Sequence, residues 1–382
     1  MTPFSSPLKR TVASLLMLAA LALPLASCSK GAKTTEQGAS PSSPSLSVES
    51  GKDTTSKGEE SMYGSSNYVN KYADTAAMDE WLSENVEGKT SPPVTFRVGG
   101  KSSADYVWQK TVGQKKQVIY FEEELPSESI HLPITYRCPD LSLRVELTLI
   151  SYTGYPVVEY TATLYNDGEG NSKAVSNLLS ADYPVESKQG TKTLHASRGA
   201  TTTYTDFEPL SYQLDGRKYF EVTNGKPTST YIPYFNLENK EQNTGTIAIL
   251  NWQGNWKAEF TPAKEGAVLK AGQHTVNVVL QKGESLDFPG MVLLFYKGDR
   301  MNGQNVYRRW LYCCNQFREQ GKKMKETNVL VCPAEYNINS NKRTIALYVK
   351  TGLIDYIDKF NIDGGWYETR ARPGTTPATG IP

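Results

Sequence analysis

The sequence predicts a mainly β protein, in which a large antiparallel β-sandwich is followed by a short β-α-β unit. Strand-like segments recur between residues 94 and 296 without an intervening helical pattern, which is typical of antiparallel sandwiches. Within this region, residues 141–149 alternate apolar and polar side chains without a break, the period of a half-buried strand. Helical spacing first appears at residue 302, and the pattern then reads strand, helix and strand, the opening of a parallel α/β domain.

The chain begins with the pattern of a lipoprotein signal peptide. Lys9 and Arg10 precede an apolar run over residues 12–25, and an Ala-Ser pair stands directly before Cys28. We therefore expect residues 1–28 to form a signal peptide with a lipobox, in which Cys28 is the lipidation site. An ordinary secretory signal with a chance cysteine is the alternative. A transmembrane helix is disfavoured, because the run is shorter than the roughly 20 residues that span a bilayer.

The next segment, residues 29–75, is expected to be a disordered tether. Ser, Gly, Thr, Lys and Glu dominate it up to residue 67, so it has too little apolar surface to form a core. Removal of the leader leaves 39 basic and 40 acidic residues, and this balance argues against a nucleic-acid partner. We expect an exported lipoprotein that faces the periplasm or the cell surface and contacts the membrane only through its lipid. Oligomerisation stays open.

Residues 76–320 are assigned to the N-terminal β-sandwich domain. Besides residues 141–149, strands are expected at 118–121, 157–164, 246–252, 256–260, 274–280 and 291–296. The segment from Trp252 to Trp256 is read as a tight hairpin, with Gly254 and Asn255 at its turn. Asp206 and Glu208 alternate on a probable strand and are expected at the surface.

The C-terminal part, residues 321–382, is assigned to the beginning of a second domain. A helix is expected over residues 302–317 as the connection. A buried strand at 328–332, a helix at 342–360 and a strand at 360–364 then follow.

The cysteines and histidines suggest neither a metal centre nor a cofactor site. The spacing of the cysteines after Cys28 fits no metal motif; they are Cys138, Cys313, Cys314 and Cys332. We expect one of the vicinal pair to pack inward as a small apolar residue. A disulfide from that pair to Cys332 is possible in an oxidising compartment but is not favoured. The histidines lack ligand spacing and are expected to be ordinary strand or loop residues; they are His131, His195 and His274.

Several segments, in this order and spacing, resemble the α-galactosidases of glycoside hydrolase family 36. They are residues 154–160 (GYPVVEY), 166–168 (NDG), 229–237 (STYIPYFNL), 245–249 (GTIAI), 252–256 (WQGNW), 283–284 (GE) with Pro289, 305–310 (NVYRRW) and 362–367 (IDGGWY). The resemblance implies a β-sandwich, or supersandwich, followed by a (β/α)₈ catalytic barrel, of which this chain would contain only the first β-α-β elements.

The resemblance also implies two substrate-binding residues, Asp363 and Trp366. In the family, the matching Asp hydrogen-bonds hydroxyls of the terminal galactose, and the Trp helps to shape the sugar pocket. A carboxylate that accepts two hydroxyl hydrogen bonds discriminates against an epimer that leaves one unpaired. Capping of the following turn is the alternative for Asp363, and packing at the barrel rim is the alternative for Trp366. Many relatives have a second Asp where this chain has Gly364.

No catalytic residue is assigned. Retaining glycosidases use two carboxylates about 5–5.5 Å apart, and in this family both are aspartates, on the fourth and sixth barrel strands. The nucleophile lies in a Lys-aromatic-Asp motif, and no such motif follows Asp363. We therefore expect the chain alone, as a truncated N-terminal part, to be inactive. Glu335 is another carboxylate near the first expected barrel strand, but a solvated loop position is favoured.

The resemblance implies a retaining, exo-acting enzyme for terminal α-linked galactose in oligosaccharides or polysaccharides. It implies no metal or nucleotide cofactor. The alternative is a carbohydrate-binding β-sandwich lipoprotein without catalytic activity. Trp252 and Trp256 would suit a sugar platform in that case, although packing in the sandwich core or against the barrel is favoured.

Overall fold

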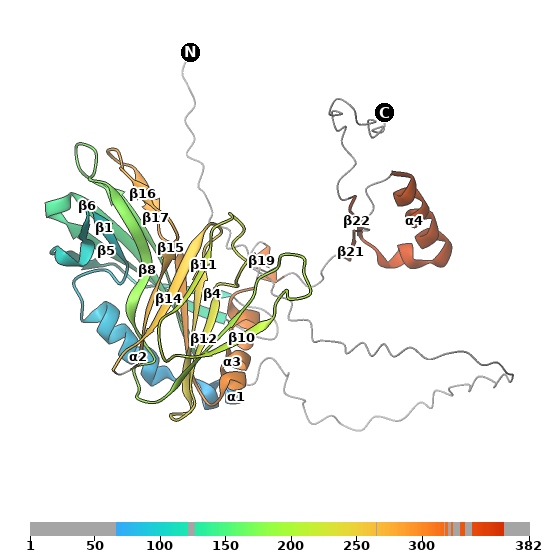
Figure 1. The fold of residues 1–382 in the computed structure, drawn as a ribbon, viewed down its shortest axis with the longest axis horizontal. Coiled ribbons are helices and arrows are strands. Elements are labelled where there is room, and N and C mark those ends of the chain that lie inside the picture. Colours follow the sequence, from blue (N-terminus) through green and yellow to red (C-terminus); the bar gives the residue numbers. More distant parts are fainter. Residues whose placement is uncertain are drawn as a thin grey trace, which may run out of the picture. The chain divides into compact units, whose positions relative to one another are not determined.

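A computed structural model of the chain describes residues 66–120, 127–264, 266–316, 318–319, 322–323, 329–332 and 338–362. The chain divides into two units, Met1–Gln316 and Phe317–Pro382. The described part of the first contains two large antiparallel sheets, called sheet A and sheet B below, together with three α-helices (Figure 1).

Sheet A has 11 strands, all antiparallel to their neighbours. Its main path runs through β10 (Pro209–Gln213), β9 (Lys192–Ser197), β12 (Tyr234–Asn239), β13 (Thr244–Asn251), β18 (Gly290–Lys297), β7 (Tyr155–Asn166), β6 (Leu143–Tyr152), β5 (Ser127–Cys138) and β3 (Gln109–Val112). Two further strands, β17 (Ser285–Asp287) and β4 (Lys116–Tyr120), pair with β7 and β5.

Sheet B has seven strands and is also antiparallel. Its path runs through β11 (Lys218–Val222), β14 (Trp256–Pro262), β15 (Ala267–Gln273), β8 (Val175–Val185), β1 (Thr95–Val98) and β2 (Lys101–Ser102), and β16 (Asn277–Val278) pairs with β8. The prediction of a mainly β, antiparallel sandwich is therefore confirmed.

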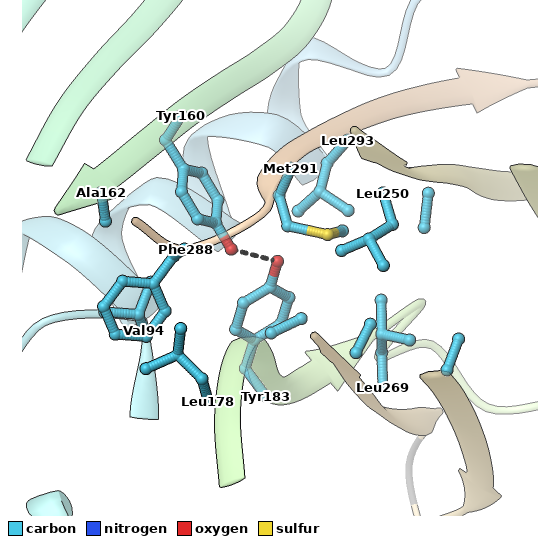
Figure 2. Close-up of a cluster of buried hydrophobic side chains, with 14 of the residues drawn as sticks. Val94, Tyr160, Ala162, Leu178, Tyr183, Leu250, Leu269, Phe288, Met291 and Leu293 are labelled. Carbon is cyan, nitrogen blue, oxygen red and sulfur yellow. Dashed lines mark hydrogen bonds between the residues drawn. The ribbon is translucent and has the colours of Figure 1, made fainter. Parts of the chain in front are cut away.

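The hydrophobic core lies between the two sheets and is rich in aromatic side chains. Phe235 of β12 contacts Trp256 and Phe260 of β14, with ring centroids 6.0 and 5.2 Å apart. Nearby, Tyr160 of β7 and Tyr183 of β8 meet through their hydroxyl groups, 2.7 Å apart, among buried aliphatic side chains (Figure 2). The Tyr160 hydroxyl also donates to the Ser180 carbonyl at 2.7 Å, so each buried polar group there is paired.

The second face of sheet A is covered by helices α1 (Ser66–Tyr72) and α3 (Arg300–Cys314). Asp299 caps α3, and Val306, Trp310 and Cys313 form its buried stripe. The helix lies close to Tyr296 of β18, because a Cβ at Gly303 would come within 2.5 Å of the tyrosine ring. A larger residue there would force α3 away from the sheet.

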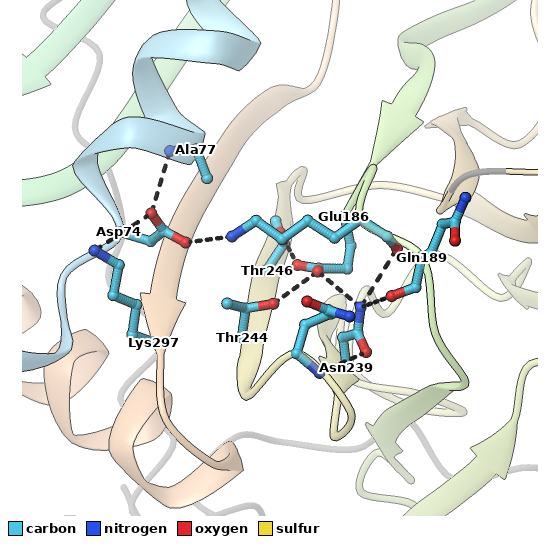
Figure 3. A network of polar contacts seen from close by, with 10 residues as sticks. Asp74, Ala77, Glu186, Gln189, Asn239, Thr244, Thr246 and Lys297 are labelled. Carbon is cyan, nitrogen blue, oxygen red and sulfur yellow. Dashed lines mark hydrogen bonds and ion pairs between the residues drawn. The ribbon is translucent and has the colours of Figure 1, made fainter.

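Helix α2 (Thr75–Leu82), followed by a π-helical turn at Ser83–Glu87, begins at a buried carboxylate. Asp74 accepts a hydrogen bond from the Ala77 amide and pairs with Lys188 at 2.8 Å and Lys297 at 3.9 Å (Figure 3). A charged hydrogen-bond acceptor at this position satisfies one orphan amide of the helix. The contact ties α2 to both sheets, since Lys188 follows β8 and Lys297 ends β18.

A second carboxylate, Glu186, lies beside this network. It accepts hydrogen bonds from the Thr244 hydroxyl at 2.9 Å and the Asn239 amide at 3.3 Å (Figure 3). Burial raises the pKa of Glu186 above its ordinary value, and these two hydrogen bonds and two nearby lysines oppose the shift.

Several expectations about the first unit are wrong, among them the strand at residues 274–280, of which only Asn277–Val278 form a strand. Residues 66–75, assigned to the tether, form α1 and the start of α2, because Val69 and Ala73 are buried against α3 and sheet A. The segment from Trp252 to Trp256 is not a hairpin, because it connects β13 in sheet A to β14 in sheet B.

The second unit contains short elements. Its described strands are β19 (Arg318–Glu319), β20 (Lys322–Lys323), β21 (Leu330–Val331) and β22 (Lys359–Phe360), and its helices are α4 (Ile338–Thr351) and a 3₁₀ turn at Leu353–Tyr356. Two more 3₁₀ turns, Ser103–Asp105 and Pro139–Leu141, lie in the first unit. Among all the described residues, no helix is both long and apolar enough to cross a membrane.

The Asp74 network predicts a graded loss of stability. Asp74→Ala removes the cap of α2 and both ion pairs, and we expect the free energy of unfolding to fall by about 2 kcal/mol. Asp74→Asn keeps an oxygen for the cap and should lose about half as much. Asp79→Ala, in the same helix but exposed, is the matched control. Urea denaturation measures all three, and equal losses for the Ala and control variants would contradict this role.

The tyrosine pair predicts unequal effects of removing two hydroxyl groups. Because Tyr160 donates to the Ser180 carbonyl, Tyr183 donates to Tyr160. Tyr160→Phe therefore removes the hydrogen bonds to both the Ser180 carbonyl and the Tyr183 hydroxyl, and should cost about 1–3 kcal/mol. Tyr183→Phe leaves the Ser180 bond intact and should cost about 1 kcal/mol. Denaturant unfolding of both variants tests the order, and a larger loss for Tyr183→Phe would refute it.

Candidate functional site

The candidate site is built on the parallel strand pair of the second unit. In β21 and β22, Leu330 lies opposite Lys359, and Val331 lies opposite Phe360. The Asn361 amide donates to the Val331 carbonyl at 2.8 Å. Since α4 lies between the two strands in the sequence, the segment is a β-α-β unit with parallel strands, as predicted.

Polar contacts extend this pairing at both ends of the strands. Before them, the Asp358 carboxylate accepts a hydrogen bond from the Val329 amide at 2.8 Å. After them, the Asn361 amide group donates to the Cys332 sulfur at 3.3 Å. The two chain segments therefore leave the strands side by side at their carboxyl ends, the edge at which parallel α/β domains place binding groups.

The residues that the sequence analysis placed at this edge lie outside the described part of the chain. They are Asp363, Trp366 and Glu335, and the lipidation site Cys28 also lies outside it. The structure describes the chain up to Ile362, directly before Asp363, and gives no geometry for either predicted sugar contact.

The helix that precedes β22 differs from its predicted bounds. It covers Ile338–Thr351 and is ended by Gly352, whose φ of 74° is left-handed. A 3₁₀ turn then leads to β22. Several apolar side chains of the second unit are exposed, among them Leu330, Leu347, Val349 and Tyr356.

The other candidate residues of the sandwich have structural roles. Trp256 is fully buried, and its indole N–H donates to the Pro227 carbonyl at 2.7 Å, whereas Trp252 is partly buried against the same core. Packing, which we favoured over a sugar platform, is therefore observed for both. Asp206 accepts hydrogen bonds from the Thr201 and Thr202 amides, both at 2.9 Å, within a surface turn rather than a strand.

Glu208 and the inward-facing cysteine of the vicinal pair also have structural roles. Glu208 forms a surface ion pair with Arg198 at 2.7 Å. Cys313 is the inward-packed member of the vicinal pair, because it is buried and Cys314 is only partly buried.

Sequence reasoning missed one polar array on sheet A. His195 contacts the Ser211 hydroxyl at 2.8 Å through Nδ1 and the Glu238 carboxylate at 3.0 Å through Nε2. Glu238 also accepts a hydrogen bond from the first amide of α3, that of Arg300, at 2.9 Å.

This Ser-His-Glu array joins side chains of neighbouring strands. Ser211 and His195 are paired across the antiparallel ladder of β10 and β9, and Glu238 belongs to β12, the next strand of sheet A. Burial lowers the pKa of His195, and the hydrogen bond that its ring makes to the Glu238 carboxylate opposes this shift. The array anchors the N-terminus of α3. Within the described residues, no three His, Cys, Asp or Glu side chains are grouped to hold a metal ion.

Comparisons with known proteins connect this fold to one group of enzymes. Neither the protein-family models nor the curated proteins gave a match. Among solved structures, the α-galactosidase AgaB of Geobacillus stearothermophilus, from glycoside hydrolase family 36, is similar over 72% of this chain and 39% of its own, with 19% identity and a TM-score of 0.52.

Two further α-galactosidase structures are similar to the chain over the same share of its length. The α-galactosidase of Lactobacillus brevis covers 72% of this chain and 38% of its own, with 14% identity and a TM-score of 0.51. A variant of the G. stearothermophilus enzyme AgaA in complex with stachyose covers 72% and 40%, with 18% identity and a TM-score of 0.50. At identities this low, the structural similarity shows a shared fold alone. The chain spans about two fifths of the length of these enzymes.

Proposed function

We propose that this chain is the N-terminal part of a lipid-anchored α-galactosidase-type glycoside hydrolase. The observation that supports it best is the fold likeness to several such enzymes over 72% of the chain. The sequence motifs, from residues 154–160 to 362–367, support the same family independently of the fold. Residues 321–382 would begin the catalytic barrel, and the exposed apolar side chains of the β-α-β unit would be covered by later strands.

The proposed substrate is a terminal α-linked galactose on an oligosaccharide or polysaccharide, cleaved with retention of configuration. One of the similar structures holds stachyose, which supports an α-galactoside. Asp363 would accept hydrogen bonds from sugar hydroxyls, and Trp366 would border the pocket. The nucleophile and the acid/base would both be carboxylates, about 5–5.5 Å apart, contributed by later strands of the barrel.

Export and anchoring form a separate part of the proposal, with their own test. We expect the chain to incorporate radiolabelled palmitate in a bacterium that processes lipoproteins, because Cys28 follows a lipobox-like sequence. Cys28→Ser should abolish the label, and Cys332→Ser is the matched control for loss of one cysteine. Label that persists in Cys28→Ser would disprove the lipidation site.

Hydrolysis is tested on two polypeptides, the chain as given and the product of its reading frame extended downstream. We expect no turnover of an aryl α-galactoside by the first and clear turnover by the second. In the extended protein, Asp363→Ala removes a charged acceptor from a dry pocket and should lower kcat/KM by about 30-fold to 1,000-fold, equivalent to roughly 2–4 kcal/mol. Asp363→Asn should lose less, because its amide oxygen still accepts one bond.

The free energy of unfolding, measured together with kcat/KM, separates sugar binding by Asp363 from capping of a turn. If Asp363 only caps a turn, Asp363→Ala should lower the free energy of unfolding by about 1 kcal/mol and leave kcat/KM nearly unchanged. Asp358→Ala, which removes a nearby carboxylate that bonds the Val329 amide, shows the kinetic effect of disturbing the strand pair alone. An extended protein that binds α-galactosides without hydrolysing them would replace the enzyme with the carbohydrate-binding alternative.

A further inference from the structure

The outer face of sheet B carries a cavity with a volume of about 410 Å³. Side chains on this face come from adjacent strands in register. Tyr219 of β11 lies opposite Glu259 of β14, Glu259 lies opposite Lys270 of β15, and Lys270 lies opposite Asp182 of β8. Hydrogen-bond acceptors and donors therefore alternate across four strands.

The cavity has an excess of positive charge. Its charged lining consists of four cationic and two acidic side chains: Arg97, Arg217, Lys257, Lys270, Asp182 and Glu259. Both carboxylates are committed, Glu259 to Arg217 at 2.7 Å and Asp182 to Lys270 at 3.6 Å. Asp182 also accepts a hydrogen bond from the Thr95 hydroxyl at 3.2 Å.

The other two cations lack a carboxylate partner among the described residues. Lys257 extends from β14 across β15, at the position of Gly272, and donates to the Asn177 side-chain oxygen on β8 at 2.8 Å. Arg97 donates only to the Gly100 carbonyl in the described contacts. Partial burial lowers the pKa of Lys257, and Glu259 opposes the shift, so an anion beside the ammonium would offset its desolvation.

We propose that this cavity binds an acidic saccharide, in which a sugar unit carries a carboxylate or a sulfate. The acid group would pair with Lys257 and Arg97 through charge-assisted hydrogen bonds. The sugar hydroxyls would pair with the alternating donors and acceptors, and the volume lies within the range of about 300–1,000 Å³ for small-molecule sites. Sugar hydroxyls can donate hydrogen bonds to Asp182 and Glu259, whereas free sulfate has no donor, and this favours a saccharide over free sulfate.

The proposal does not depend on hydrolysis, because its test is binding to the full chain. Calorimetry at low and moderate salt would compare trigalacturonate, a sulfated galactobiose, raffinose and inorganic sulfate. We expect at least one acidic saccharide to bind about tenfold more tightly than raffinose and sulfate, with an affinity that falls as salt rises. Lys257→Gln and Arg97→Gln should each weaken this binding about tenfold.

Lys282→Gln is the matched control, since Lys282 is an exposed lysine paired with Glu169 at 2.5 Å and does not line the cavity. It should bind as the wild type does. Thermal melting confirms that each variant is folded, and Lys270→Gln replaces any that is not. The proposal is overturned if neither acidic saccharide binds, if raffinose or sulfate binds equally well, or if the cavity variants match the control.

Discussion

The strands of sheet A that lie under helices α1 and α3 have to bury both of their faces, and the positions of the surrounding elements follow from this constraint. Strand β18 shows it most clearly, because seven of its eight residues are buried. Met291, Leu293 and Phe295 belong to the core shared with sheet B, whereas Val292, Leu294 and Tyr296 belong to the cluster under α1 and α3. Since a strand directs successive side chains to opposite faces, β18 joins the sandwich core to the helical layer. The close approach of α3 at Gly303 and the anchoring of its first amide by Glu238 keep that second face covered.

The same constraint explains which parts of the fold the sequence predicts. Strand β6 has one face in solvent where Arg144 and Glu146 point outward, so its alternation is plain in the sequence. Strand β18 has no solvent face and is a continuous apolar run, which still indicates a strand because turn residues bound it. The connection from Trp252 to Trp256 was mistaken for a hairpin, because turn chemistry describes a local bend and not the sheet that the chain joins next. Helix α1 was missed because it is short and its burial depends on α3, more than 200 residues later.

The candidate sites differ in how far the sequence predicts them. The parallel strand pair of the second unit was recognisable from two short apolar runs separated by a helix. The motif at residues 362–367 is a local signal, because its few consecutive residues are part of the family resemblance. The charged cavity on sheet B has no such local signal. Its side chains come from residues 95 to 270 and become neighbours only through the order β11, β14, β15, β8 and β1. Charges at alternate positions of a strand are ordinary for a solvated face, and only the register shows that two cations remain without carboxylates.

The position of β18 also has a consequence for folding. Strands β5, β6 and β7 are consecutive hairpins and can pair as soon as they are synthesised. The other edge of β7 pairs with β17 and β18, about 120 residues later in the chain. Until that segment arrives, β7 presents an unsatisfied edge and its apolar side chains face water, a state prone to intermolecular strand pairing. Such long-range pairing slows folding, so the edge of β7 stays open until β17 and β18 have been made, whereas β5 and β6 close their edges locally.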